Sequence, residues 1–178
     1  MKMNIKDLSY YMVKRKNTMK DIKVKDENGK FRLRVSGMII KNNKLLVHET
    51  QKFKGYCLPG GHVELGESTK QAILREMKEE LKINVKITDL FCINENIYDT
   101  GETTSQEINY YYKLENLDFL PDEFFSVKEI DKGVEKEHKF AWIDINDLCD
   151  KNFKPDHMAK IIMKNLESKD NVILSDNR

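Results

Sequence analysis

The sequence is poor in the residues that mark several classes of protein. Its 178 residues include only 3 cysteines, 3 prolines and 8 glycines, which excludes a disulfide-rich scaffold and a low-complexity chain rich in proline and glycine. It has no run of roughly 18 uncharged apolar residues, so an integral membrane protein is excluded. The N-terminus lacks the apolar segment of a secretory signal peptide. We therefore expect a cytoplasmic protein with no membrane partner.

The three cysteines are not arranged for metal binding or for disulfide pairing. They are odd in number, and no two of them form a C-x-x-C pair. A zinc cluster or a disulfide framework would need closer or even-numbered cysteines. We expect Cys57, Cys92 and Cys149 to be reduced, small and buried.

Charge is balanced over the whole chain but not along it. The chain has 31 basic and 30 acidic residues, a formal net charge of +1, whereas residues 1–30 alone carry nine Lys/Arg and four Asp/Glu, a net +5. Such a segment either attracts phosphates or is a solvated extension, which is the interpretation that we favour. Since a domain has about 150 residues, we expect a basic extension at 1–30, one domain at 31–168 and a C-terminal tail at 169–178.

Hydrophobic periodicity predicts a mixture of strands and helices. Apolar residues at helical spacing predict helices over 69–82 and 158–166, the first with Ser68 as its N-cap. The segments with the patterns of strands are 31–40, 45–48, 85–97, 108–114 and 139–143. Hairpins and long strand pairs argue against a purely parallel sheet. The fold class predicted is therefore α/β, with a mixed sheet.

Three glutamates lie on one face of the first predicted helix. Glu76, Glu79 and Glu80 are spaced i, i+3 and i+4, so their side chains are within reach of each other. Like charges at this spacing each cost about 0.2–0.5 kcal/mol on an exposed helix. Either the helix has a solvated acidic face, or the carboxylates share a hard divalent cation such as Mg2+, which prefers oxygen ligands. Periodicity alone leaves both interpretations open.

The segment before this helix favours the metal interpretation. Pro59 is followed by Gly60 and Gly61, and glycine lets the backbone approach an ion or a ligand closely because it has no Cβ. Glu67 precedes the helix, and Arg75 directly precedes the first glutamate. An arginine can hold a carboxylate through two parallel hydrogen bonds. We expect this pair to fix the loop over the helix.

Read together, these residues resemble the Nudix box, G-x5-E-x7-R-E-U-x-E-E-x-G-U, in which U is a bulky apolar residue. The match runs from Gly61 to Ile83 and includes eight of the nine defined positions. The exception is Lys82, which stands where the family has its second glycine. Glycine there suits a left-handed helix cap, whereas lysine has a steric cost in that conformation, which Asn84 could adopt instead. The departure concerns the helix cap rather than the carboxylates.

The resemblance covers roughly residues 31–150 and implies an α/β/α sandwich with a mixed sheet. It also implies hydrolysis, with Mg2+ or Mn2+, of the pyrophosphate bond in a nucleoside diphosphate linked to another moiety. The expected partner is a small nucleotide-type substrate. Family members often form dimers, so the resemblance is compatible with a homodimer, but the sequence leaves the oligomeric state open. Two residues, Arg75 and Glu67, would brace the loop against the helix. The metal ligands implied by the resemblance are Gly60 through its carbonyl, Glu76, Glu79 and Glu80.

The general base and the substrate contacts are less well defined by the motif. The base could be Glu79 or Glu80, or one of the later glutamates Glu135 and Glu137, of which we favour Glu137; for both of these a solvated charged loop is the alternative. His62 adjoins the glycine pair, and Glu95 interrupts the apolar series of a predicted strand. We expect both to contact the substrate. The four histidines show no metal-ligand spacing, so none is predicted to bind metal.

Two other functions are compatible with the same motif. A non-catalytic nucleotide-sensing module would have the same pocket, but a pure binder has no need to concentrate three carboxylates near phosphates. A pyrophosphohydrolase of RNA 5′ ends would use the basic residues 14–25 along the backbone. That segment has few aromatic residues for base stacking. We therefore expect a small-molecule substrate and no nucleic-acid partner.

Overall fold

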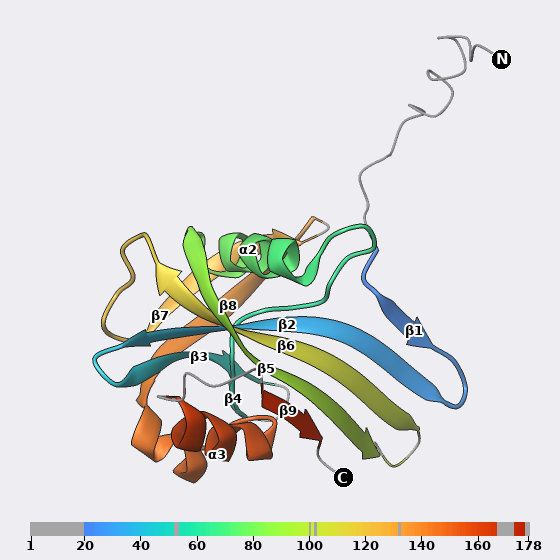
Figure 1. Cartoon of the computed structure of the whole chain (residues 1–178). Coiled ribbons are helices and arrows are strands. Elements are labelled where there is room, and N and C mark those ends of the chain that lie inside the picture. The colour runs from blue at the N-terminus through green and yellow to red at the C-terminus, as the bar shows by residue number, and fades with distance from the viewer. Residues whose placement is uncertain are drawn as a thin grey trace, which may run out of the picture.

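Two helices lie on opposite sides of one mixed sheet. The structure is a computed structural model, and it describes residues 20–51, 54–99, 101, 103–131, 133–166 and 173–176. Helix α2 (Thr69–Glu80) covers one face of the sheet, and helix α3 (Asp156–Asn165) covers the other (Figure 1). This is the α/β/α sandwich predicted from the sequence. None of the described helices is long and apolar enough to cross a membrane.

The sheet runs in the order β7-β8-β3-β2-β6-β5-β9, with β1 paired to β2 and β4 paired to β3. The pairs β2–β6 and β5–β9 are parallel, and the other pairs are antiparallel. The strands are β1 (Lys23–Lys25), β2 (Gly29–Lys41), β3 (Lys44–Thr50), β4 (Gly55–Cys57), β5 (Val85–Asp99), β6 (Thr104–Asn116), β7 (Phe125–Asp131), β8 (Val134–Asp144) and β9 (Ile173–Asp176), and the 3-10 helix η1 (Ile145–Asp150) precedes α3.

Every segment with a predicted strand pattern lies in a strand, and both predicted helices are present. Helix α2 ends two residues before the predicted limit, and α3 starts at Asp156, two residues earlier than predicted. Strands β1, β4, β7 and β9 were not predicted. Two of them, β1 and β9, lie outside the expected domain limits of 31–168 yet pair with its sheet. Residues 1–19 of the expected extension lie outside the described residues.

The sheet divides where β2 and β3 separate. These strands pair only beside their turn, within residues 40–45. Further along β2, the amides of Val35 and Gly37 donate to the carbonyls of Gly61 and Pro59, over 3.0 and 2.9 Å. The Pro-Gly-Gly segment therefore fills the gap between two half-sheets, and the strands hold it in the middle of the molecule.

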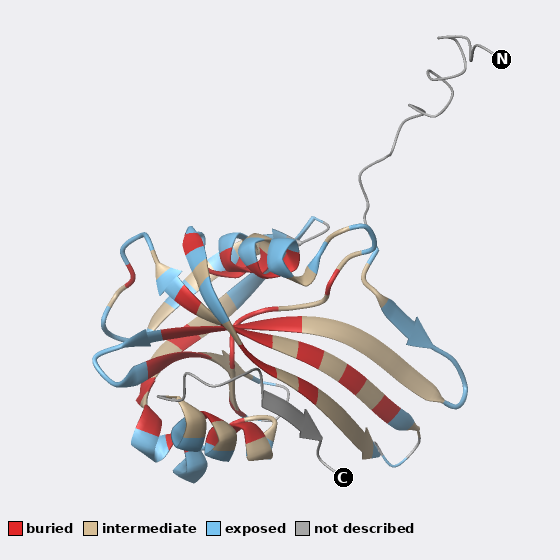
Figure 2. Ribbon diagram, in the orientation of Figure 1, coloured by how far each residue is buried: buried red, intermediate tan, exposed pale blue. Residues whose placement is uncertain are grey.

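A hydrophobic cluster lies on each face of the sheet, and buried residues alternate with less buried ones along the strands (Figure 2). On the α2 side, Ile73 and Met77 belong to one cluster with Val35, Leu46 and Phe140. Each such side chain contributes about 1.5–3 kcal/mol when fully buried. This apolar stripe fixes the rotation of α2 and thereby the direction of its glutamates. The cluster on the α3 side includes Met38, Leu45, Val47, Tyr111, Met158 and Ile162.

The two ends of α2 are capped by different means. Ser68 Oγ accepts from the Gln71 amide over 3.2 Å, and Gln71 Oε1 accepts from the Ser68 amide over 2.8 Å, which is a capping box. At the other end, Lys82 has φ of 58°, so the lysine itself takes the left-handed conformation of the family glycine. Its Nζ donates to the Glu79 carbonyl over 2.8 Å. Asn84 does not take that conformation.

The cysteines are free thiols with different environments. Cys92 is buried, Cys57 is half-buried and Cys149 is exposed. The expected burial is confirmed for Cys92 but is wrong for Cys149. This residue lies in η1, and its Sγ is 3.2 Å from Met163 Sδ of α3. It lies at the surface because the apolar face of η1 is formed by Ile145 and Leu148 instead.

Candidate active site

The three glutamates of α2 differ in their access to solvent. Glu76 and Glu80 are 9% and 8% exposed, whereas the side chain of Glu79 is 45% exposed. Glu80 Oε2 accepts a hydrogen bond from the Gly60 amide over 2.9 Å. Two carboxylates are therefore held inside against the glycine segment, and the third lies at the edge, where water can reach it.

The glycine pair is required by the close approach of this helix. A Cβ on Gly61 would lie 2.4–2.5 Å from the carboxyl atoms of Glu76, so the Glu76 carboxylate would have to leave its present position. Gly60 has φ of 137°, and a Cβ there would lie 2.3 Å from the Val35 carbonyl oxygen. Only glycine fits both positions. The Glu76 carboxylate consequently rests directly on the backbone of the loop.

Arg75 connects the loop to the glutamates. Its Nε and Nη2 donate to the two carboxylate oxygens of Glu67, over 3.2 and 2.7 Å. Its Nη1 donates to Glu76 and Glu79 over 2.9 and 2.8 Å. Nη2 also donates to the His62 carbonyl over 2.9 Å. The two-point contact expected between Arg75 and Glu67 is thus present, and it holds the loop over the helix.

The buried carboxylates lack sufficient positive charge around them. Burial raises the pKa of Glu76 to about 7, although Arg75 opposes this shift. Burial and the neighbouring charge of Glu76 raise the pKa of Glu80 to about 8. A divalent cation would stabilise both carboxylates in the charged form. The carboxylate oxygens gathered against the backbone of Gly60 and Gly61 therefore fit Mg2+ or Mn2+, which prefer oxygen ligands.

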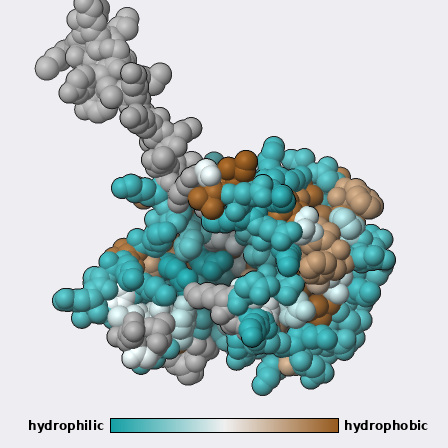
Figure 3. All heavy atoms as spheres, turned by 180° about the vertical axis from the view of Figure 1, so that it is seen from behind, coloured by the Kyte–Doolittle hydropathy of each residue, from teal (hydrophilic) through white to brown (hydrophobic). Residues whose placement is uncertain are grey.

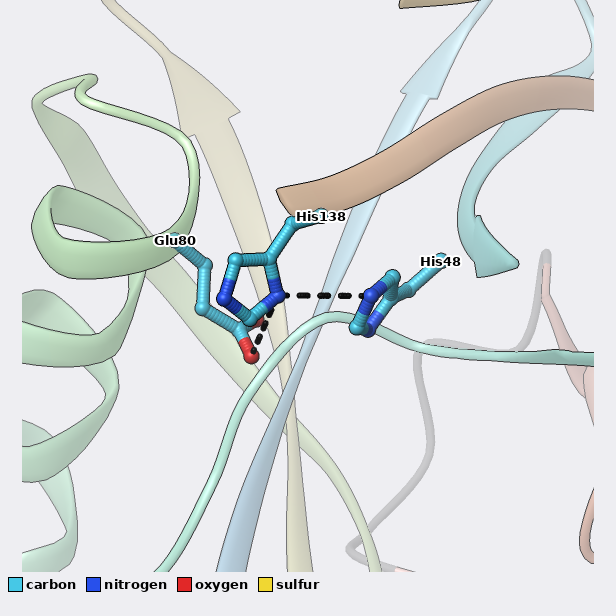
Figure 4. A group of neighbouring side chains, drawn as sticks. All are labelled: His48, Glu80 and His138. Carbon is cyan, nitrogen blue, oxygen red and sulfur yellow. Dashed lines mark hydrogen bonds and ion pairs between the residues drawn. The ribbon is translucent and has the colours of Figure 1, made fainter. Parts of the chain in front are cut away.

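Two histidines of the sheet lie beside Glu80, and the sequence analysis missed both. His138 Nδ1 of β8 is 3.8 Å from Glu80 Oε1 and 3.3 Å from His48 Nε2 of β3 (Figure 4). His138 Nε2 is 2.7 Å from Glu129 Oε2 of β7. The two histidines are 90 residues apart in the chain, so no local spacing could reveal them. The pairing of β3 with β8 brings them together.

The other residues predicted for the site are His62, Glu95 and Glu137, and only His62 contacts the arginine that holds the glutamates. Half-buried His62 contacts Arg75 through its carbonyl, and its Nδ1 is 3.9 Å from Asp21 Oδ2. Glu95 of β5 accepts from Gln106 Nε2 over 2.5 Å. Glu137 is exposed and lies on the face of β8 opposite to His138, since successive strand residues alternate. The structure does not bring Glu95 or Glu137 into the described contacts of the three glutamates, and their roles stay predictions.

On the side of the three glutamates that faces β2, the Gly60 carbonyl contacts Arg34. Arg34 Nη2 donates to this carbonyl over 3.3 Å. The molecular face seen from behind is hollowed near its middle, with hydrophilic side chains beside the hollow (Figure 3). A hollow with this lining suits a polar ligand.

Comparison with known proteins gives a consistent assignment. A family model described as NUDIX domain matches residues 30–164. An ADP-ribose pyrophosphatase of Methanocaldococcus jannaschii is 44% identical over 59 residues, which are 32% of this chain and only 35% of that protein. A probable DHNTP pyrophosphohydrolase of Lactococcus lactis is 32% identical over 124 residues, 64% of this chain and 73% of that protein.

Solved structures share the fold at low sequence identity. A MutT protein of Bacillus halodurans has a TM-score of 0.61 at 20% identity, covering 81% of this chain and 88% of that one. A NUDIX hydrolase of Nitrosomonas europaea has a TM-score of 0.56 at 23% identity, covering 78% and 90%. At these identities the structural likeness shows the α/β/α fold alone.

Proposed function

The chain belongs to the Nudix family of hydrolases, and we propose that it hydrolyses the pyrophosphate bond of a nucleoside diphosphate linked to another moiety, using Mg2+ or Mn2+. The observation that carries the proposal is the pair of buried carboxylates, Glu76 and Glu80, held against a glycine backbone. Phosphoryl transfer depends on charge neutralisation and positioning more than on covalent chemistry. A carboxylate-held cation supplies that neutralisation when bound.

Glu76, Glu79 and Glu80 would hold the metal, with the Gly60 carbonyl as a further ligand. Arg75 and Glu67 act as positioning residues, because their hydrogen bonds connect the loop to the helix. The contact of the Gly60 carbonyl with Arg34 would have to yield for that carbonyl to bind metal.

We propose that Glu79 accepts the proton of the attacking water. Its side chain is 45% exposed, whereas the other two glutamates are buried away from solvent. The water oxygen forms the new bond to phosphorus, and the bond from phosphorus to the leaving phosphate oxygen breaks. Glu137 is the alternative acceptor, and replacing each of the two by glutamine separates them. The role belongs to the residue whose replacement removes the acidic limb of the pH–rate profile, which is the loss of rate at low pH where the base is protonated.

The substrate class rests on the relatives and on the surroundings of the site. The names of both curated relatives denote cleavage of a pyrophosphate bond, one of them in ADP-ribose. His62 Nε2 is buried and has no hydrogen-bond partner among the described residues, so it is available to a substrate. Together with Glu95, it is the proposed substrate contact.

A screen of nucleotides with Mg2+ tests this function. Nucleoside triphosphates, ADP-ribose, dinucleoside polyphosphates and nucleotide sugars are incubated with the protein, and release of phosphate or nucleoside monophosphate is measured. We expect Glu80→Gln to lower the rate by roughly a hundredfold or more, since a single electrostatic contact of the transition state contributes this much. Glu123→Gln, which changes an exposed loop residue, is the matched control.

Each outcome has a defined meaning. Full activity of a folded Glu80→Gln variant would refute the role of Glu80 as ligand. Binding of nucleotides without turnover by the unaltered protein would identify a sensing module instead of an enzyme. Thermal unfolding of each variant shows whether a lost rate reflects lost structure.

A further inference from the structure

A second donor set lies beside the glutamates and differs from them in chemistry. His48 Nε2, a Glu80 carboxylate oxygen and His138 Nδ1 all lie within 4.8 Å of one another. The three side chains come from β3, α2 and β8 and point toward a common space (Figure 4). Two of the three donor atoms are imidazole nitrogens, whereas the magnesium site described above has only oxygen donors.

The distances are close to those of a coordinated metal. Two nitrogens that each lie 2.0–2.1 Å from a tetrahedral zinc ion are about 3.3 Å apart, and the His48 and His138 nitrogens are 3.3 Å apart. Glu80 Oε1 is 3.8 Å from His138 Nδ1, and all three donor atoms lie within 4.8 Å of one another, so the Glu80 carboxylate has to move toward the two histidines to complete the same geometry. Its other oxygen is already held by the Gly60 amide.

The surroundings orient the imidazoles for metal binding. Glu129 accepts from His138 Nε2 over 2.7 Å, which places the proton on that nitrogen and leaves the lone pair of Nδ1 directed at Glu80 and His48. The carboxylate–histidine pair is a common outer partner of metal sites. His48 is stacked on Phe140, with ring centroids 5.1 Å apart. Both rings are therefore positioned before any metal binds.

We propose that His48, Glu80 and His138 form a site for a transition-metal cation, of which Zn2+ and Co2+ are the types that fit. Imidazole nitrogen suits these metals, whereas Mg2+ demands oxygen ligands in an octahedron and retains its water. In the metal-free protein His48 Nε2 donates to His138 Nδ1. Metal binding replaces this hydrogen bond, with the His48 proton on Nδ1 in its other neutral tautomer.

Glu80 belongs to both donor sets, so the two metals compete for it. The inference rests on the proposed function only in this respect: Zn2+ at the histidine site withdraws Glu80 from the magnesium site and inhibits hydrolysis. The structure thus provides a way in which a trace metal regulates a magnesium-dependent reaction.

Titration of the metal-free protein with Co2+, without Mg2+ or nucleotide, tests the site directly. We expect one equivalent of Co2+ to bind with a visible absorption spectrum typical of nitrogen coordination, and Zn2+ to displace it. His48→Gln and His138→Gln should each weaken Co2+ binding by more than about tenfold, and Glu129→Gln by about tenfold, because it removes the orienting carboxylate.

His157→Gln is the matched control. His157 lies in α3, where its Nε2 contacts Asn94 Oδ1 over 2.7 Å, on the other side of the sheet from Glu80. This variant should bind Co2+ as the unaltered protein does. Circular dichroism of all variants shows whether each remains folded, and His48→Asn provides a second, smaller replacement at the first position.

The outcomes separate this site from the proposed function. Unchanged Co2+ spectra and affinities in folded His48 and His138 variants would overturn the proposal, because carboxylates alone would then hold the metal. Loss of Co2+ binding in these variants supports it even if the unaltered protein hydrolyses no nucleotide tested. Where hydrolysis is observed with Mg2+, Zn2+ should inhibit the unaltered protein and inhibit His138→Gln much less.

Discussion

Glu80 connects the loop, the helix and the sheet at the level of single residues. One carboxylate oxygen accepts from the Gly60 amide, and the other faces His138. Its pKa is raised to about 8, first by burial and then by the charge of Glu76. Without a cation, the charged form of this carboxylate is destabilised by burial and by the charge of Glu76. With a cation, the same carboxylate is well placed to act as a ligand. This change of state has consequences that can be measured.

In the metal-free protein, we expect the free energy of unfolding to fall by about 1–2 kcal/mol between pH 6.5 and pH 8. Glu76 and Glu80 have pKa values raised to about 7 and 8, so the native state binds more protons than the unfolded chain in this range. The lowered pKa values of His48 and His62, about 4 for each, have the opposite effect, but only between about pH 4 and 6.5. Urea unfolding in EDTA measures the fall.

The same experiment contains its own control. Glu80→Gln should reduce the fall, because glutamine carries no titrating proton, and Mg2+ should counteract it by mass action on the native state. Glu123→Gln should retain the fall of the unaltered protein. A free energy of unfolding that rises between pH 6.5 and pH 8 would contradict the raised pKa values.

The contact that the sequence predicted in this region, between Arg75 and Glu67, joins residues that are near each other in the sequence. Arg75 and Glu67 are eight positions apart. Glu67 lies just before α2 and Arg75 lies within it, so the start of this helix is enough to bring them together. His48, Glu129 and His138 could not be predicted, because they meet Glu80 only through the pairing of β3, β7 and β8. Neither the spacing of these residues nor their type distinguishes them from surface positions.

At the level of elements, length decides what the sequence can predict. The long strands and both helices carry enough residues for a period of two or of 3.6 to be visible. Strands β1 and β4 have three residues each, which is too few for a periodic pattern to be visible. They form because the edges of β2 and β3 offer backbone groups with which they pair. Strand β7 alternates Phe125, Val127 and Glu129, a signal that was available but was not used.

The C-terminus of α2 gives a prediction of its own. Lys82→Gly should raise the free energy of unfolding by about 1 kcal/mol, since Lys82 has φ of 58° and a left-handed conformation costs an L-residue about 1–2 kcal/mol. The hydrogen bond from its Nζ to the Glu79 carbonyl is lost in the variant and offsets part of the gain. Urea unfolding of both proteins at the same pH measures the difference in their free energies of unfolding.

Lys82→Ala distinguishes the two contributions. Alanine keeps the side-chain clash of the left-handed conformation and loses the amine, so this variant should be no more stable than the unaltered protein. If glycine and alanine at this position gave equal free energies of unfolding, backbone strain would not explain the effect.

At the level of the whole molecule, residues before the expected boundary at residue 31 contact the domain and pair with its sheet. The Ile22 amide donates to the Val63 carbonyl over 2.7 Å, and Val24 of β1 pairs with Phe31 of β2. A truncation that is meant to remove the basic N-terminal residues should therefore end at residue 19, since a longer one would first remove the backbone contacts of Lys20 and Ile22 and then strand β1.

We expect a chain that starts at Lys20 to hydrolyse small nucleotides at the rate of the full chain. RNA affinity, measured against salt concentration, should show the same slope for both chains, because the slope reports the number of phosphates that are neutralised. A shallower slope after truncation would show that the basic residues contact RNA, and it would favour the RNA 5′-end alternative.

The insertion of the Pro-Gly-Gly segment between the half-sheets also limits how this chain can vary. β4 is paired with β3 up to Cys57, and Gly61 is bonded to Val35 of β2, so the connection between these two points has a fixed number of residues. One added residue would shift Gly60 and Gly61 from their places beside Val35 and Glu76, where the Cβ of another residue would lie 2.3–2.5 Å from neighbouring atoms. Variants with altered substrate preference should therefore keep the length of this connection and differ in other loops.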